Sequence, residues 1–495
     1  MQFLRRLIWR VIGAQSSELA RKVISGSIWQ LFARMLMRAV NLIVFMVVVR
    51  VLKPDEVGVA NAATIVISWA YGLSQLGLEA QVIRMGDRAE EYLPTTFFVR
   101  ILRSFLIGAI ICGTAWWTAD LLRAPDSAPL IFVLGVNFAL GGIANAATVL
   151  LNRDLEVKNL ALRSAFDTYV SAVVTIGVVL IFRTYWAIPL GTLATTISGV
   201  INSYLVTPKR VRPAFNWERF KELYSYGRWI TLGHMANFIT ANIEGPLVSR
   251  LGGVHQLGLY VQAQRFAALP GQELGAAVAA TLFAGVSKIR QDQRKLQSAL
   301  EQVIVTVTKL LVPACLFMGI FGVPLVRIIL TDAYVEAAPV FMVFVLFTTL
   351  LPITITGGTF LNAMGLPQVD LLALLIRFTV FVSAVIPMFR AMGITGLALT
   401  ACIAGSIGSL FSYFVMCRKM PFPAFAGLFY LVRQALVPLT LAGGAWLLAR
   451  QLENPFLQVL AGLPFFLAAQ FFAIKTAKLS LPWNLDRQLE QTPPQ

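Results

Sequence analysis

Charged residues inside long apolar stretches are the first candidates for chemistry in this chain, because a charge at the centre of a bilayer costs about 2.5–3.5 kcal/mol on insertion scales. Basic residues outnumber acidic ones in these stretches. The basic residues are Arg34, Arg38, Arg265, Lys309, Arg377 and Arg433, and the acids are Glu79, Asp167, Glu244 and Glu273. Since guanidinium groups bind phosphate oxygens in pairs, this excess predicts a site for an anionic group such as a diphosphate or an acidic sugar.

Our candidates for contact with the anion are Arg34, Arg38, Arg265, Lys309 and Arg377. Arg34 and Arg38 are four residues apart, so they share one face of a helix. Two other roles stay open for the cations: structural ion pairs, for example between Arg34 and Glu79, and snorkelling of the side chain to the membrane face. For the acids Glu79, Glu244 and Glu273 we consider coupling to H⁺ or Na⁺, or ion pairing. For Asp167 we expect a structural pair.

The composition indicates which elements must position these charges. Of the 495 residues, 57% are hydrophobic and 13% are charged, whereas about 25% are charged in an ordinary soluble domain. The mean hydropathy is +0.73, so the bilayer must be the solvent for most of the chain. The net charge of +17 does not predict nucleic-acid binding, because the basic residues lie in short clusters between apolar runs.

A helix needs about 20 residues to cross the hydrocarbon core. With that length the sequence predicts fourteen spans and an all-α fold. The spans are 27–50, 57–82, 97–122, 128–151, 161–182, 186–206, 226–250, 256–285, 300–326, 337–362, 368–389, 393–416, 426–449 and 455–474.

The distribution of basic residues predicts the orientation. Most of the 41 Lys and Arg residues fall on one face of the predicted topology, and cytoplasmic loops carry the excess of Lys and Arg. We therefore expect an even number of spans with both termini in the cytoplasm and no cleaved signal peptide. The longest polar connection, 207–225, mixes basic and aromatic residues, which favours a segment at the anionic inner leaflet.

Two short patterns recur along the chain and indicate an internal repeat. VVRVLKPDEVGVA at 48–60 matches VSRLGGVHQLGLY at 248–260, with an offset of 200 residues. Further on, Ala-Pro and Leu-Asn pairs at 128–129 and 151–152 recur at 338–339 and 361–362, with an offset of 210. Because the copies lie six spans apart, the repeat predicts two pseudo-symmetric six-helix lobes in the same orientation, with two extra C-terminal helices.

The predicted organisation is a basic cytoplasmic N-terminal segment (1–26), an N-lobe (27–206), a basic cytoplasmic linker (207–225), a C-lobe (226–418), two further spans (419–478) and a cytoplasmic tail (479–495). Gly245-Pro246 in span seven and Pro270-Gly271 in span eight are potential helix breakers.

The same turns carry a family resemblance. RVLKPDEVG at 50–58 and RLGGVHQLGLYVQAQRFAALP at 250–270 resemble the polysaccharide transporter family, which includes Wzx-type oligosaccharide flippases. That family belongs to the multidrug/oligosaccharidyl-lipid/polysaccharide flippase superfamily. The resemblance implies a bacterial inner-membrane protein with two lobes around a V-shaped cavity, working by alternating access.

The resemblance also implies the cargo, an undecaprenyl-diphosphate-linked oligosaccharide repeat unit of O-antigen, capsule or exopolysaccharide. A polysaccharide polymerase and its assembly machinery would then be partners, besides membrane lipids. Spans one, two, seven and eight would surround the cavity. This would bring Arg34, Arg38, Glu79, Glu244, Arg265 and Glu273 to it.

Two other transport functions stay open. An ion-coupled multidrug exporter of the same superfamily would favour an acidic cavity, whereas cations prevail here. A flippase for the peptidoglycan precursor would share the cationic cavity but be essential. The sequence predicts no enzyme: Gly-Lys never occurs, so a Walker A site is excluded, and neither an HExxH metal helix nor a cofactor site is present.

Overall fold

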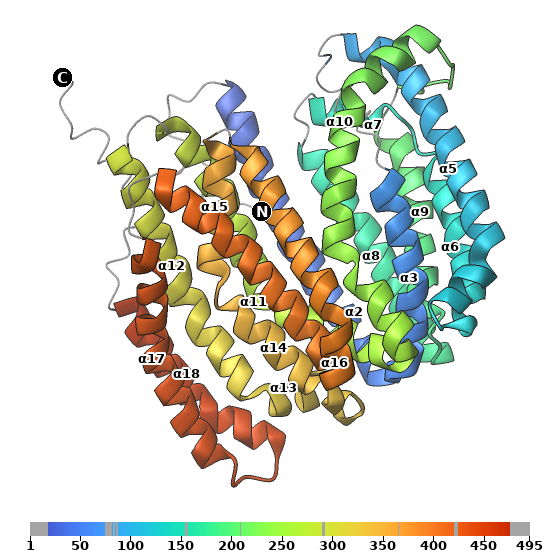
Figure 1. Ribbon diagram of the computed structural model, residues 1–495. Helices are drawn as coiled ribbons and strands as arrows, with labels where there is room; N and C mark the ends of the chain where they lie inside the picture. Colours follow the sequence, from blue (N-terminus) through green and yellow to red (C-terminus); the bar gives the residue numbers. More distant parts are fainter. Residues whose placement is uncertain are drawn as a thin grey trace, which may run out of the picture. The chain divides into compact units, whose positions relative to one another are not determined.

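The computed structural model describes residues 18–74, 82, 85, 88–153, 157–207, 209–289, 293–364, 366–419 and 424–475. Helices and their connections account for these residues, without any strand among them (Figure 1). The α-helices are α2 (Glu18–Val51), α3 (Pro54–Ser74), α5 (Ala89–Leu121), α6 (Ala128–Gly141), α7 (Thr148–Arg153), α8 (Val157–Phe182), α9 (Ala187–Val206), α10 (Trp217–Asn242), α11 (Glu244–Ile289), α12 (Gln293–Ile320), α13 (Gly322–Ile329), α14 (Ala338–Thr348), α15 (Leu351–Ala363), α16 (Pro367–Lys419), α17 (Ala424–Ala449) and α18 (Pro455–Lys475).

Several of these helices can cross a membrane. Within the described ranges eight are long and apolar enough, and nine if the bent pair Asp332–Thr348 and Leu351–Asn362 forms one span. The eight are Phe32–Val51, Pro54–Ser74, Ala89–Leu121, Ala161–Phe182, Leu296–Ile320, Gln368–Lys419, Gly427–Ala449 and Pro455–Ala473. The protein is therefore an all-helical multi-pass membrane protein, whereas fourteen crossings stay a prediction.

The chain divides into two compact units, with the boundary between Gly258 and Leu259 inside α11. That helix is interrupted at Gly253, whose φ of 76° lies in the left-handed region that glycine adopts without steric cost. The first predicted breaker is confirmed, since α10 ends at Asn242 just before Gly245-Pro246. Pro270 instead lies within α11. The predicted lobes and their linker at 207–225 stay a prediction.

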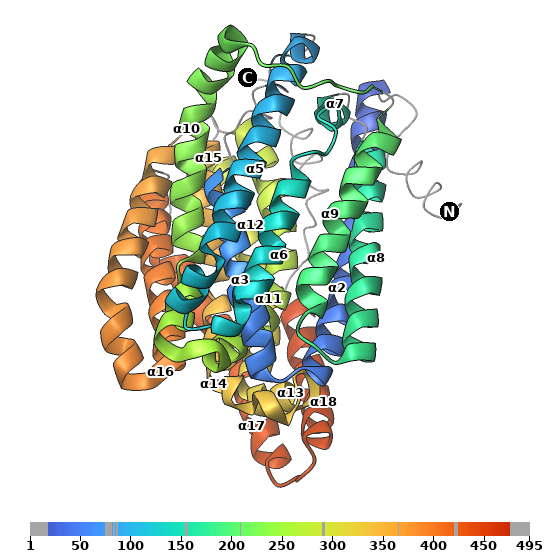
Figure 2. The same cartoon turned by 90° about the vertical axis from the view of Figure 1, so that its right-hand side faces the viewer.

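In the first unit, α3, α5 and α6 share an apolar core. Its buried residues are Val59, Ala63, Ile67, Ile111, Ala115, Ala119, Ala128, Leu130, Ile131, Leu134 and Phe138. α2 packs against α8, and α8 against α9, so these three helices lie side by side (Figure 2). α3 begins at a proline followed by two acids, and the Lys53 N–H donates to Glu56 Oε2 (2.8 Å). Proline, acids and a side-chain acceptor for the N–H before the helix are all favourable in a first helical turn.

In the second unit, α12 is the central helix and packs against α14, α15, α17 and α18 (Figure 1). One apolar cluster joins α12 to α15, α16 and α17, and its largest buried side chains include Phe360 and Tyr413. A second cluster joins Phe317 of α12 and Phe321, the residue just before α13, to Ala445 and Ala449 of α17. The small alanines let the two helices approach closely.

The Ala-Pro repeat begins equivalent helices. Ala128 and Ala338 are the first residues of α6 and α14, and a 3₁₀ turn precedes each helix. Spans four and ten, predicted to be continuous, are both broken: α6 ends at Gly141 before α7, and α14 ends at Thr348 before α15. A helix end leaves carbonyl groups without partners. At the first break, Arg100 donates to the carbonyl oxygens of Gly142 (3.3 Å) and Ala144.

The other repeat makes a reciprocal contact within the first unit. A Cβ atom at position 58 would lie 1.8 Å from the Val254 carbonyl oxygen, and one at position 258 would lie 2.0 Å from the Pro54 carbonyl oxygen. With the offset of 200, Gly58 corresponds to Gly258 and Pro54 to Val254, so each copy of the repeat contacts the other in the same way. His255 Nδ1 and Asp55 Oδ2, another equivalent pair, are 3.1 Å apart.

Candidate functional site

The predicted cations of the first unit lie on α2. Arg34 and Arg38 are both exposed, one turn apart on the same face, as predicted. Arg34 forms no hydrogen bond or ion pair within the ranges that the structure describes. Its guanidinium is therefore available to an anion, whereas Glu79, its suggested partner, lies outside the described residues.

The other three predicted cations share the second unit. On α11, Phe266 is buried and stacks on Phe341 of α14, with ring centroids 4.6 Å apart and an interplanar angle of 12°. Successive helical residues point about 100° apart, so the preceding side chain, Arg265, is turned away from this contact and is exposed. It makes no hydrogen bond or ion pair with the residues described. Arg377, on α16, is half-buried.

Lys309 has the most unusual surroundings of the five. It lies on α12, is only 7% exposed, and has no hydrogen-bond acceptor or acid as a partner in the described part of the chain. The preceding Thr308 is fully buried, and its Oγ1 also lacks a partner. Lys309 Nζ is not among the atoms that are fully closed to solvent, but placing an ammonium group in such apolar surroundings without an acceptor is still costly. An anionic ligand at this position would offset that cost.

Of the three predicted acids, only Glu244 has a side chain that the structure describes. Glu244 is the first residue of α11 and is 7% exposed. Acids are favourable in the first turn of a helix, which is a structural reason for its position. Glu273 lies on α11, but its side chain is outside the described part, as is the whole of Glu79. Their roles in coupling or ion pairing stay a prediction.

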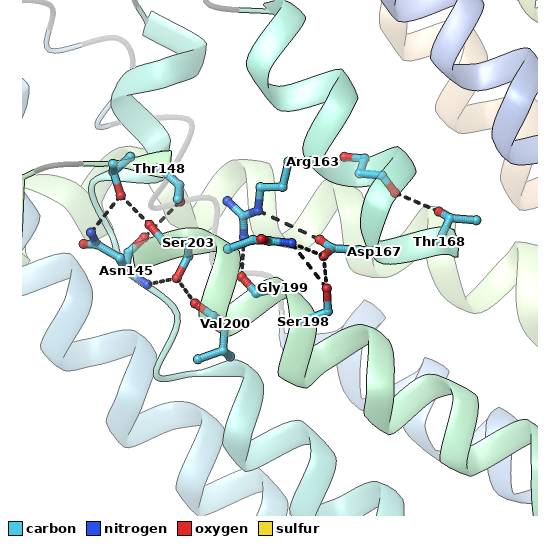
Figure 3. Close-up of polar contacts among 12 residues, drawn as sticks. Asn145, Thr148, Arg163, Asp167, Thr168, Ser198, Gly199, Val200 and Ser203 are labelled. Carbon is cyan, nitrogen blue, oxygen red and sulfur yellow. Dashed lines mark hydrogen bonds and ion pairs between the residues drawn. The ribbon is translucent and has the colours of Figure 1, made fainter. Parts of the chain in front are cut away.

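Asp167 forms the structural pair that we predicted (Figure 3). Its Oδ1 accepts hydrogen bonds from Ser198 Oγ (2.5 Å) and Asn202 Nδ2 (2.7 Å), and its Oδ2 lies 3.9 Å from Arg163 Nε. Arg163 Nη2 also donates to the carbonyl oxygen of Gly199 (2.8 Å). These contacts join α8 to α9 and leave the carboxylate well satisfied. The carboxylate therefore holds the two helices together.

Asn145, in the break between α6 and α7, belongs to a second polar cluster that the sequence did not reveal. Its backbone N–H donates to Ser203 Oγ, and its Nδ2 donates to Thr207 Oγ1 and to the Lys209 carbonyl oxygen, each at 2.8 Å (Figure 3 shows Asn145 and Ser203). These bonds fix the broken helix to the end of α9. The only signal in the sequence is an asparagine after the glycine pair 141–142, a combination common in turns.

Comparisons with known proteins add to this geometry. A family model described as "Polysaccharide biosynthesis protein" matches residues 47–339, more than half of the chain. The lipopolysaccharide biosynthesis protein WzxC of Escherichia coli (strain K12) is 22% identical over 416 residues, covering 81% of this chain and 82% of the relative. The succinoglycan biosynthesis transport protein ExoT of Rhizobium meliloti (strain 1021) is 23% identical over 420 residues, covering 84% and 85%.

A solved structure shows the same fold. The lipid II flippase MurJ, in an inward closed conformation, superposes with a TM-score of 0.71, covering 92% of this chain and 99% of the other. The identity between the two is 15%. At that identity the likeness concerns the fold and not the cargo.

Proposed function

Since the chain belongs to the polysaccharide biosynthesis protein family, we propose that it is a flippase for an undecaprenyl-diphosphate-linked oligosaccharide repeat unit. It carries the repeat unit of an O-antigen, capsule or exopolysaccharide from the cytoplasmic to the periplasmic leaflet of a bacterial inner membrane. Two relatives named for lipopolysaccharide biosynthesis and succinoglycan transport support this assignment. The protein is a transporter and not an enzyme.

The observation that carries the proposal is a set of cations in apolar helices without partners. Arg34, Arg265 and Lys309 form no hydrogen bond or ion pair with the described residues. A diphosphate offers several anionic oxygens, and charge-assisted bonds to them are roughly twice as strong as neutral ones. In the proposed mechanism these cations, with Arg38 and Arg377, hold the diphosphate or an acidic sugar while the polyprenyl tail stays in lipid.

The finer features of the mechanism belong to the same proposal. Fourteen crossings form two six-helix lobes and two added C-terminal helices, with both termini in the cytoplasm. The lobes alternate access between the two faces of the membrane. A counter-ion, H⁺ or Na⁺, drives the cycle through Glu79, Glu244 or Glu273, and a polysaccharide polymerase consumes the delivered unit.

Surface glycan display in a deletion strain tests this function. We expect display to be lost on deletion and restored by the wild-type protein at its normal level. A strain without any paralogue that still displays its glycan would contradict the proposal. Lysis on deletion would indicate the peptidoglycan precursor as cargo, and sensitivity to cationic drugs with normal display would indicate a multidrug exporter.

A further inference from the structure

Four aromatic rings form a continuous platform where the segment 209–216 meets α5 and α10. Phe215 is the central ring: its centroid lies 5.5 Å from that of Phe98, 6.2 Å from that of Trp217 and 5.9 Å from that of Phe220. The rings of Trp217 and Phe220 also meet, at 5.7 Å. Phe215 and Trp217 are nevertheless 48% and 65% exposed. We propose that this platform binds the headgroups of anionic phospholipids.

The platform is held in place by bonds that need no ligand. The Ala214 N–H donates to the Pro94 carbonyl oxygen (3.2 Å), and Arg219 Nη1 donates to the Glu91 carbonyl oxygen (2.8 Å). Asn216 caps α10 by accepting a hydrogen bond from the Arg219 N–H (3.0 Å). An ordered surface loses little conformational entropy on binding.

The charge around the rings suits an anion. Lys209 forms an ion pair with Glu90, so its charge is already balanced by an acid. Three further cations, Arg210, Arg212 and Lys221, are exposed and form no hydrogen bond or ion pair with residues of the described chain. Glu91, Glu218 and Glu222 are the exposed acids nearby, and Glu222 Oε2 accepts a hydrogen bond from the Tyr92 hydroxyl (2.5 Å). With Arg219 the cations beside the rings number four against these three acids, so the net charge there is positive.

The position of the platform along α5 matches the level of the lipid headgroups. This helix has 33 residues, which makes it roughly 50 Å long, well beyond the hydrocarbon thickness of about 30 Å. Arg103 is the last charged residue before the long apolar part of α5. Phe98 precedes it by five residues, about 7–8 Å along the axis, which places the platform at the headgroups.

Aromatic and basic residues together fit this layer and the inner leaflet in particular. Rings settle at the boundary between headgroups and acyl chains, while Lys and Arg reach the phosphates. In the predicted topology this face also gathers most of the basic residues of the chain, as the cytoplasmic face does in membrane proteins. The cytoplasmic leaflet is the anionic one. The diphosphate of the proposed cargo offers the same phosphate oxygens as a phospholipid headgroup. The test therefore measures binding of phosphatidylglycerol and of undecaprenyl diphosphate separately.

The test measures lipid selectivity of the delipidated full-length protein by native mass spectrometry, with phosphatidylglycerol and phosphatidylcholine added in equal amounts. The variant R210A/R212A/K221A removes the unpaired cations. The matched control, R50A/R123A/R390A, removes three exposed cations elsewhere. R210K/R212K/K221R keeps the charge and checks that substitution at these positions is tolerated.

We expect the first variant to lose at least about tenfold of its preference for phosphatidylglycerol, because each basic residue near an anionic surface contributes about fivefold. The control and the charge-preserving variant should keep the wild-type preference. An equal loss in the control, or no loss in the first variant, overturns the proposal. So does a first variant that keeps the preference and instead loses binding of undecaprenyl diphosphate, since the platform would then serve the cargo.

Discussion

Two charged residues that both lie inside apolar stretches of the sequence have opposite surroundings in the structure. Asp167 accepts two hydrogen bonds and lies beside Arg163, whereas Lys309 is buried without a partner in the described chain. Asp167 therefore has a structural role. The lysine lowers stability unless it binds an anion, and a cost of this kind is typical of functional groups in membranes.

Replacing Lys309 with methionine should separate function from stability. Methionine has similar length and helix propensity but no charge to bury, so we expect the free energy of unfolding to rise by about 2 kcal/mol. Transport of the lipid-linked glycan should fall at the same time. Thermal unfolding in detergent and glycan display measure the two effects, with Arg390→Met, an exposed position on α16, as the control. A destabilised Lys309→Met protein would show that the ammonium group has a structural role.

Asp167→Ala should instead lower the free energy of unfolding. The change leaves Arg163 without its acid and Ser198 and Asn202 without their acceptor, so we expect a loss of about 3 kcal/mol. Asp167→Asn keeps an oxygen acceptor and should lose less. The melting temperatures of both variants test this. If Asp167→Ala melts like the wild type but does not transport, the residue couples transport to an ion instead.

At the scale of the helices, the crossing of α3 with the first part of α11 depends on two glycines. The backbones touch reciprocally at Gly58 and Gly258, and no side chain fits between them. Gly253, with its left-handed φ, interrupts α11 beside this contact. The repeated sequence is thus also a repeated contact.

Gly58→Ala and Gly258→Ala should each lower the melting temperature. Their Cβ atoms would lie within about 2 Å of a carbonyl oxygen, and overpacking of this kind costs about 1–3 kcal/mol. Gly177→Ala on α8 is the matched control, because a Cβ atom there meets nothing within 4 Å. Alanine is the better helix former, so this control should be as stable as the wild type or more so. Similar losses at all three positions would rule out the close crossing as the cause.

The sequence revealed long apolar helices and the repeat, because hydropathy and short matching patterns depend on local residues only. It did not reveal the breaks in spans four and ten, since glycine at 141–142 and proline at 352 lie in apolar runs that also suit a continuous helix. It predicted the structural pair of Asp167, which the structure confirms, but it did not show that Lys309 is buried without a partner in the described chain, because the surroundings of a buried side chain come largely from other helices. Asn145 was missed for the same reason: its partners lie about 60 residues away in the sequence.

At the scale of the whole molecule, family membership and unpaired cations point to the same activity. The family match identifies a polysaccharide biosynthesis protein, and the likeness to the solved MurJ structure concerns the fold alone. The chain itself supplies cations inside apolar helices that suit a phosphate-linked cargo better than a cationic drug. The central claim is therefore that the protein alone moves such a cargo across a bilayer.

Translocation of a fluorescent undecaprenyl-diphosphate-linked oligosaccharide in vesicles containing only the purified protein tests that claim most directly. We expect wild-type vesicles to move the probe and Arg265→Ala vesicles to do so at least about tenfold more slowly, because the variant loses charge-assisted bonds worth about 1.5–3 kcal/mol. Arg390→Ala should match the wild type. Folded wild-type protein that moves the probe no faster than empty vesicles, with or without a gradient of H⁺ or Na⁺, would contradict the account.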